Sequence, residues 1–251
     1  MNTTSTIYNS IFAGIHRFEV KVNIGGIDYG MDVLTSLNSN RSVFGSGSPR
    51  LGLAPAGELS LSLYLDSGAV PRMAEIRPYI RVVNDTRQSE WISKGVYFVD
   101  TREADTTTGL LTLRAYDAML KGEQAYPSTE HAWPAADLDV VREIASFLHV
   151  GIDAQTTELM TAGFMIPLPS QYTIRETLQY IAALYGGSFV ITDSNCLRLI
   201  PLWSVKSEAD APLGGTHRLT AAPAFPAPHR PLLFQPRLRL PLCRLRLRSG
   251  G

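Results

Sequence analysis

Hydrophobic and polar residues alternate along several stretches of the first half of the chain. From Arg17 to Ile24 every second residue is apolar, and the residues between them are charged or polar. A period of two is typical of a half-buried β-strand. Gly25 and Gly26 follow, a pair that favours a tight turn, and residues 27–33 alternate again. The pattern therefore predicts a β-hairpin.

Four more strands are predicted before residue 120. Leucines alternate with serines over 59–65, residues 79–83 form a short apolar run, and residues 91–100 are rich in β-branched and aromatic side chains. Residues 110–116 are expected to pair with 91–100 across the polar turn 105–109. Residues 38–57 contain four glycines and two prolines, which predicts a loop. No alternation of strands and helices is present, which argues against a parallel nucleotide-binding sheet. We expect an antiparallel sheet or barrel of about six strands over residues 1–120.

The hydrophobic period changes from two to that of a helix after residue 120. Asp137 is expected to cap a helix that carries an apolar stripe to Leu148, and Gly151 is expected to end it. Thr173 and Glu176 have the spacing of a capping box that opens a second helix.

The second helix is expected to end at Gly186 and Gly187. A hairpin over residues 189–192 and 196–200 is predicted to follow it. Residues 121–203 are thus expected to form a small module of two helices and a hairpin. The predicted fold class of the whole chain is α+β.

Residues 204–251 show neither the period of a strand nor that of a helix. The last 35 residues carry seven arginines and six prolines but no Asp, Glu or Lys, whereas residues 1–216 carry a net charge of −7. The formal net charge of zero hides this asymmetry. One interpretation is an out-of-frame C-terminus, and the other is a natural disordered basic tail. The expected organisation is therefore a β domain (1–120), an α+β module (121–203) and a low-complexity tail (204–251).

Several classes of protein and site are not favoured. The first fifteen residues carry no basic residue, so no signal peptide is predicted, and no apolar run reaches the length of a membrane span. The two cysteines, Cys196 and Cys243, do not predict a disulfide framework or a zinc site. The basic tail lacks regularly placed aromatic residues and the rest of the chain is acidic, so no nucleic acid partner is expected.

The motifs of common catalytic sites are missing. The sequence contains no nucleophile elbow, no phosphate-binding P-loop and no zinc-protease helix. The glycine-rich stretch Gly45–Pro49 is expected to be a flexible loop. The five histidines do not have ligand spacing on a helix, and His131 and His149 are expected to be structural or exposed. We expect no catalytic, cofactor-binding or metal-binding residues, and no cofactor.

One group of carboxylates is a candidate for an acid–base or hard-metal site. Its members are Asp100, Glu103, Asp105 and, after the next strand, Asp117. The favoured interpretation is a solvated hairpin end, which also needs polar residues. Arg102 and Arg114 would neutralise part of its charge.

Several sequence segments resemble those of a known protein family. They are Asn23–Leu34, Arg72–Tyr79, Trp91–Asp100, Leu111–Leu120, Tyr126-Pro127, the helix from Asp137, and the block Thr173–Trp203. Together they resemble tail-tip proteins of siphophages and prophages, the baseplate hub family that includes the N-terminal region of tail-associated lysins. The resemblance covers residues 16–203 and contains no catalytic signature.

The resemblance implies a fold, a role and partners. It implies β-barrel-like domains with inserted α+β modules, assembled as a homotrimer that contacts the tube, distal tail and tape-measure proteins. It implies a virion structural protein at the tail tip, made in the cytoplasm of the bacterial host, with a role in tail assembly and host attachment. The match ends at Trp203, so the lytic activity found in some members is not carried over, and the chain is expected not to be an enzyme.

Two alternative functions stay open at this point. A tail-associated peptidoglycan hydrolase would need a catalytic group, and Asp100, Glu103 and Asp105 are the available candidates. A receptor- or carbohydrate-binding β module would use an exposed aromatic platform, for which Trp91 and Trp133 are the candidates. Packing in the hydrophobic core is the favoured interpretation of both tryptophans.

Overall fold

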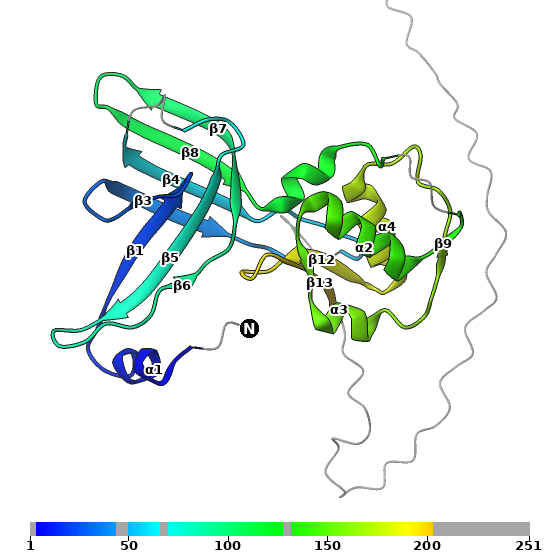
Figure 1. Cartoon of the computed structure of the whole chain (residues 1–251), viewed down its shortest axis with the longest axis horizontal. Helices are drawn as coiled ribbons and strands as arrows, with labels where there is room; N and C mark the ends of the chain where they lie inside the picture. The colour runs from blue at the N-terminus through cyan, green and yellow to red at the C-terminus, as the bar shows by residue number, and fades with distance from the viewer. Residues whose placement is uncertain (1–3, 44–49, 66–69, 128–131, 203–251) are drawn as a thin grey trace, which may run out of the picture. The chain divides into compact units, whose positions relative to one another are not determined.

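The computed structural model describes residues 4–43, 50–65, 70–127 and 132–202 (Figure 1). It contains a large antiparallel sheet, smaller sheets and several helices, so the predicted α+β class is confirmed. The expected tail at 204–251, the stretch Gly45–Pro49 and His131 lie outside the described residues.

The large sheet contains eight strands, where about six were expected. It has the order β2-β1-β5-β7-β8-β4-β3, and β6 pairs with β5. The strands are β1 (Arg17–Ile24), β2 (Ile27–Tyr29), β3 (Leu34–Asn40), β4 (Glu58–Tyr64), β5 (Glu75–Val83), β6 (Ile92–Ser93), β7 (Tyr97–Asp105) and β8 (Leu110–Tyr116). All its pairings are antiparallel.

Apolar side chains on one face of this sheet form the hydrophobic core of residues 17–116. Leu59, Leu61 and Leu63 of β4 are fully buried, as their alternation with serine predicts. Val22, near one end of the strand order, and Leu37, at the other end, pack in the same hydrophobic cluster. This cluster thus extends across the sheet from β1 to β3.

The first hairpin forms where the sequence predicts it, with a shorter return strand. Gly25 and Gly26 have φ values of 59° and 93°, the left-handed conformations that a two-residue hairpin turn of this kind needs. β2 ends at Tyr29, because the chain then turns, with the amide of Leu34 donating to the carbonyl of Gly30.

Two other expectations about the large sheet were wrong. The predicted loop at 38–57 begins with the last residues of β3, whose polar side chains do not show a buried face in the sequence. The predicted strand 91–100 is broken into β6 and β7. Gly95, with a φ of 110°, interrupts the extended backbone between them.

Helices and small sheets make up the rest of the described chain. The helices are α1 (Thr6–Phe12), the 3-10 helix η2 (Ala118–Glu123), α2 (Asp137–Leu148), α3 (Ala154–Leu159) and α4 (Ile174–Leu184). The strands are β9 (Ala135–Ala136), β10 (Gly151–Ile152), β11 (Met165–Ile166), β12 (Gly187–Ile191) and β13 (Cys196–Pro201). β12 and β13 are the predicted hairpin, and β10 pairs with β13 in parallel.

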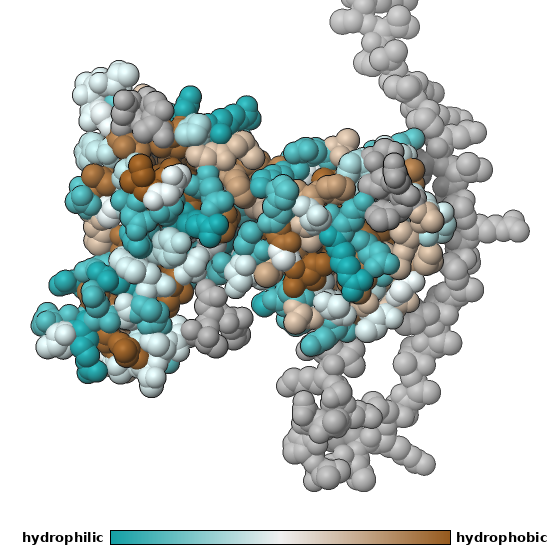
Figure 2. Space-filling view, in the orientation of Figure 1, coloured by the Kyte–Doolittle hydropathy of each residue, from teal (hydrophilic) through white to brown (hydrophobic). Residues whose placement is uncertain are grey.

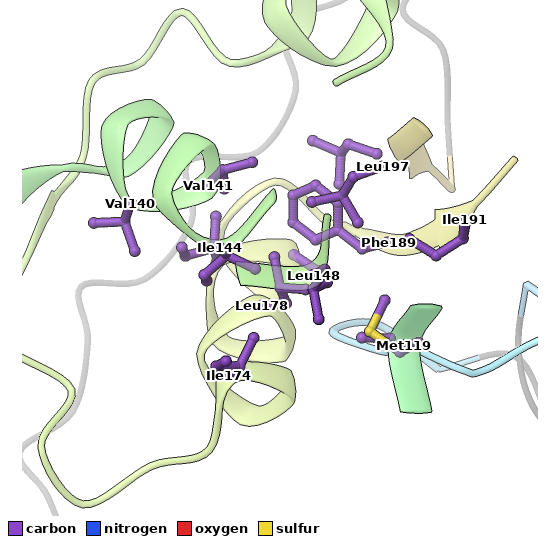
Figure 3. Close-up of a cluster of buried hydrophobic side chains, with 14 of the residues drawn as sticks. Met119, Val140, Val141, Ile144, Leu148, Ile174, Leu178, Phe189, Ile191 and Leu197 are labelled. Atoms are coloured by element: carbon purple, nitrogen blue, oxygen red, sulfur yellow. The ribbon is translucent and has the colours of Figure 1, made fainter. Parts of the chain in front are cut away.

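A second hydrophobic cluster lies between α2, α4 and the β12–β13 hairpin (Figure 3). Ile144 and Leu148 of α2 and Leu178 of α4 are fully buried there, next to Phe189 of β12. Ile144 and Leu148 are four residues apart, the spacing of one helix face. The hydrophobic period of the sequence therefore located this helix.

The capping predictions had different outcomes. Thr173 forms the predicted capping box, accepting from the amide of Glu176 at 3.1 Å, while the Glu176 carboxylate accepts from the amide of Thr173 at 2.7 Å. Asp137 is not the cap of α2, because the N-cap position belongs to Ala136. The helix ends at Leu148 rather than at Gly151, since His149 adopts the left-handed conformation that terminates it.

The segment between β3 and β4 packs into the second cluster. Leu53 forms a parallel bridge with Ser188 of β12, and the Phe189 amide donates to the Leu53 carbonyl at 2.8 Å. Ala54 is buried in the same cluster. A stretch from the β part of the sequence thus completes the core of the α+β part. The domain boundaries expected from the sequence stay a prediction.

Candidate functional site

The carboxylates weighed as a catalytic group do not gather into a site. Asp100 lies 3.7 Å from the exposed Arg72 guanidinium, and Glu103 is exposed. Asp105 closes the β7–β8 turn by accepting from the Thr107 amide and the Thr108 hydroxyl. The Thr108 hydrogen bond is the largest cause that lowers the pKa of Asp105. The solvated hairpin end is the better description.

The arginines expected to neutralise that group have other partners. Arg102 donates to the Val70 carbonyl, and Arg114 lies 3.2 Å from Glu58.

Asp117 lies at the opposite end of the β7–β8 pair. Asp105 faces Leu110 in the register, whereas Asp117 follows Tyr116 at the other end of β8. The Asp117 carboxylate is buried and accepts from the amides of Gly57 at 2.7 Å and Met119 at 3.0 Å. Burial raises the pKa of Asp117 to about 6.

A cavity of about 260 Å³ lies beside Asp117. Arg41 and Asp193 line it and form an ion pair, and Arg198 on the same wall lies 2.6 Å from Asp153. The charges on its wall therefore have partners within the protein. No local sequence pattern predicts this arrangement, because its members come from distant parts of the chain.

The described residues contain no group of three or more His, Cys, Asp or Glu side chains placed to hold a metal ion. His16 is half-buried, and its Nδ1 lies 2.8 Å from the Gly14 carbonyl oxygen. His149 ends α2, and its backbone carbonyl accepts from the Asn195 amide group. None of the helices in the described ranges is long and apolar enough to cross a membrane.

The large sheet presents two edges on which strands of another chain can pair. β3 pairs only with β4 within the described part of the chain. On the other side, β2 covers β1 only from Val22 to Ile24, which leaves the outer side of residues 17–21 without a paired strand among those described. Unpaired backbone groups on such edges favour pairing with another strand.

An exposed apolar area adjoins the second edge, over α1 (Figure 2). Ile7 and Phe12 are each 50% exposed, Ile15 is 98% exposed and Phe18 at the start of β1 is 44% exposed. The rings of Phe12, His16 and Phe18 contact one another. We call Ile7, Phe12, Ile15 and Phe18 the α1 patch. Ser5 anchors α1 by two hydrogen bonds to the Glu90 carboxylate, at 2.6 and 2.8 Å.

Sequence reasoning missed the α1 patch. The helix has seven residues, which is too short for a clear helical period. Ser5 as an N-cap and the spacing of Tyr8 and Phe12 are the signals that could have located it.

The two tryptophans weighed as aromatic platforms have different surroundings. Trp133 packs against the second hydrophobic cluster and meets the Tyr126 ring edge to face at 6.1 Å, so core packing is confirmed for it. Trp91 belongs to neither hydrophobic cluster. Its indole contacts Lys21 and Arg81. Core packing was therefore the wrong interpretation of Trp91.

No protein-family model matches the sequence, and no curated protein matches it either. The solved structures that are similar to this chain include two tail proteins. The tail protein from Neisseria meningitidis MC58 has 16% identity and a TM-score of 0.49, with 76% of this chain and 57% of that chain covered. The 43 kDa tail protein of prophage MuSo2 from Shewanella oneidensis has 13% identity and a TM-score of 0.48, with 74% and 56% covered. This chain thus spans a little over half the length of each.

Proposed function

We propose that this protein is a structural component of a phage or prophage tail, located at the tail tip or baseplate hub. The sequence phrases between residues 16 and 203 support this role. The proposal extends to this chain the role of the two solved tail proteins. It assigns the protein no catalytic activity.

The observation that carries the proposal is the pair of open sheet edges together with the α1 patch. The free side of β1 and the free side of β3 lie at opposite ends of the strand order. Head-to-tail assembly would pair one edge with the other edge of the next copy and cover both in a closed ring. The homotrimer implied by the sequence resemblance is such a ring, and the α1 patch would be buried beside its contact.

Self-association tests this proposal directly. Light scattering of the full chain across a dilution series up to about 100 μM, chosen to detect weak contacts, is expected to show a mass that rises toward the trimer. Ile15→Asp places a charge in the α1 patch at a side chain that is 98% exposed, so the fold should be kept and association lost. Leu168→Asp, at a side chain 43% exposed in the α+β part, is the control and should associate normally.

Two results would contradict the proposal. A strict monomer over the whole series would rule out assembly of this chain by itself, and equal association of both variants would exclude the α1 patch. Gold labelling of particles induced from the host strain tests the location separately, because label along the tube or on the capsid would exclude the tail tip.

The hydrolase alternative has no support from the arrangement of Asp100, Glu103 and Asp105. Zymography on peptidoglycan checks it: we expect no clearing band, whereas a band that disappears with Asp100→Ala would establish the alternative.

A further inference from the structure

We propose that a groove beside Trp91, on the outer face of the large sheet, binds an uncharged oligosaccharide. This inference goes beyond the structural role proposed above and does not depend on it. Trp91 lies just before β6, is only half-buried and packs in neither hydrophobic cluster. An indole kept at the surface by polar neighbours is suited to contact a ligand that has both apolar and polar faces.

The indole is held from the side of the sheet. In the β1–β5 register Glu19 faces Arg81 and Lys21 faces Tyr79, so these four side chains project from one face. The Arg81 guanidinium carbon lies 4.3 Å from the indole centroid, and Lys21 Nζ lies 5.0 Å from the centroid. Two cation–π contacts fix the ring before any ligand arrives, which lowers the entropy cost of binding.

The groove next to the ring has a volume of about 320 Å³. The indole and Met31, which is 62% exposed, supply its apolar walls, while Lys21 and Asp28 supply polar groups. Its size falls at the lower end of the range of small-molecule sites, roughly 300–1,000 Å³. An apolar platform with a few fixed polar groups suits a sugar ring, whose C–H face is apolar and whose rim carries hydroxyl groups.

The charges of the groove favour an uncharged ligand. Lys21 forms an ion pair with Asp28 at 2.6 Å, and Arg81 forms one with Glu19 at 2.7 Å, so these four side chains carry no net charge. The exposed Arg17 lies 3.5 Å from the same Glu19 carboxylate. Asn23 also donates to Asp28 at 2.7 Å, which fixes that carboxylate. A carboxylate has about four acceptor positions, so Asp28 keeps capacity for the hydroxyl groups of a sugar. A polyanion would have to displace the acids from their basic partners.

Isothermal titration calorimetry on the full chain tests the proposal. The probes are maltotriose, cellotriose, mannotriose and N,N′,N″-triacetylchitotriose, with dextran sulfate as the charged comparison. We expect millimolar or tighter binding of at least one uncharged probe. Trp91→Ala is expected to weaken this binding at least tenfold, and Trp91→Phe to weaken it less because a ring remains.

A second variant and a matched control separate binding from folding. Asp28→Asn changes a side chain that is 50% exposed on the β1–β2 hairpin and is expected to weaken binding while the melting temperature stays close to that of the wild type. Tyr64→Ala removes an aromatic side chain that is 54% exposed on β4 and should bind as the wild type does.

Three results would overturn the proposal. They are no heat with any uncharged probe, binding of dextran sulfate alone, and equal affinity of the wild type, Trp91→Ala and Asp28→Asn. Since each is read from heats of saccharide binding, none bears on self-association or on location in the tail. Failure of this inference is thus distinguishable from failure of the proposed function.

Discussion

The carboxylate of Asp193 forms an ion pair with the guanidinium of Arg41, 152 positions earlier in the chain. Asp193 lies in the turn between β12 and β13, and Arg41 follows β3. Lys94 joins them, with its Nζ 3.0 Å from Asp193 and its carbonyl accepting from Arg41 at 3.0 Å. This cluster ties the turn of the small hairpin to the large sheet.

Breaking this cluster should lower stability measurably. Arg41 and Asp193 are each about three-quarters buried. Exposed ion pairs contribute under about 1 kcal/mol to stability, whereas disruption of a fully buried pair costs about 3–5 kcal/mol, so an intermediate cost is expected here. We expect Arg41→Ala to reduce the free energy of unfolding by about 1–2 kcal/mol in urea denaturation. Arg142→Ala, in the largely exposed pair with Asp139, is the control and should cost below about 0.5 kcal/mol. Equal losses would show that the cluster adds nothing.

Removal of the cap of α4 should cost about 1 kcal/mol. Thr173→Ala deletes the hydroxyl that accepts from the Glu176 amide, so a donor in the first turn loses its partner. Glu176→Gln can keep the reciprocal bond and should have a smaller effect. Thermal denaturation followed by circular dichroism measures both variants. An unchanged stability of Thr173→Ala would contradict the role of the capping box.

Stability should depend on pH through Asp117. Its pKa is about 6 in the folded protein and 3.8 without perturbation, so between these values the folded state holds a proton that the unfolded state has released. The contribution of this group to stability therefore decreases as pH rises from about 4 to about 6, by up to about 3 kcal/mol. Above that range it stays constant.

Asp117→Asn isolates this effect, because the other carboxyl groups are the same in both proteins. Urea denaturation at several pH values should show the wild type gaining stability relative to Asp117→Asn as pH falls from 7 to 4. A difference that is constant with pH, or one that shrinks on acidification, would contradict the raised pKa.

The close approach of Gly52 to α4 should exclude a side chain. A Cβ at Gly52 would lie 2.9 Å from the Cβ of Ala183 and 3.0 Å from the Gln179 carbonyl oxygen. Gly109 has nearly the same φ, 70° against 71°, but open space around it. Gly109→Ala should cost about 1–2 kcal/mol from backbone strain, and Gly52→Ala about 1–3 kcal/mol more from crowding. Equal losses of unfolding free energy for the two variants in chemical denaturation would show that α4 can move away from a side chain at position 52 without cost.

Removal of the C-terminal stretch should leave the fold intact. The sequence after Trp203 has no periodic apolar face, so it should bury little surface. Truncation after Trp203 is expected to shift the melting temperature by no more than about 2 °C, since a change of 1 kcal/mol in a chain of this size corresponds to about 2–4 °C. A large decrease would show that these residues pack on the rest.

The sequence by itself determined the elements whose signals are local. β1 and β4 follow from the period of two, and α2 and α4 follow from the helical period. The capping box at Thr173 and the turn at Gly25 follow from the residue types that those conformations require. Such signals depend on neighbours within a few positions, which is why they are readable without a structure.

Only the tertiary structure decided which distant residues meet. The polar strand β3 has no buried face of its own, and it is a strand because β4 pairs with it. Ala54 enters the second core because its neighbour Leu53 pairs with Ser188 of β12. The sequence around Trp91 predicts a core residue. In the structure, Lys21 and Arg81 contact its indole on the outer face of the sheet. These outcomes depend on pairings between segments that are far apart in the chain. The local hydrophobic period carries no information about such pairings.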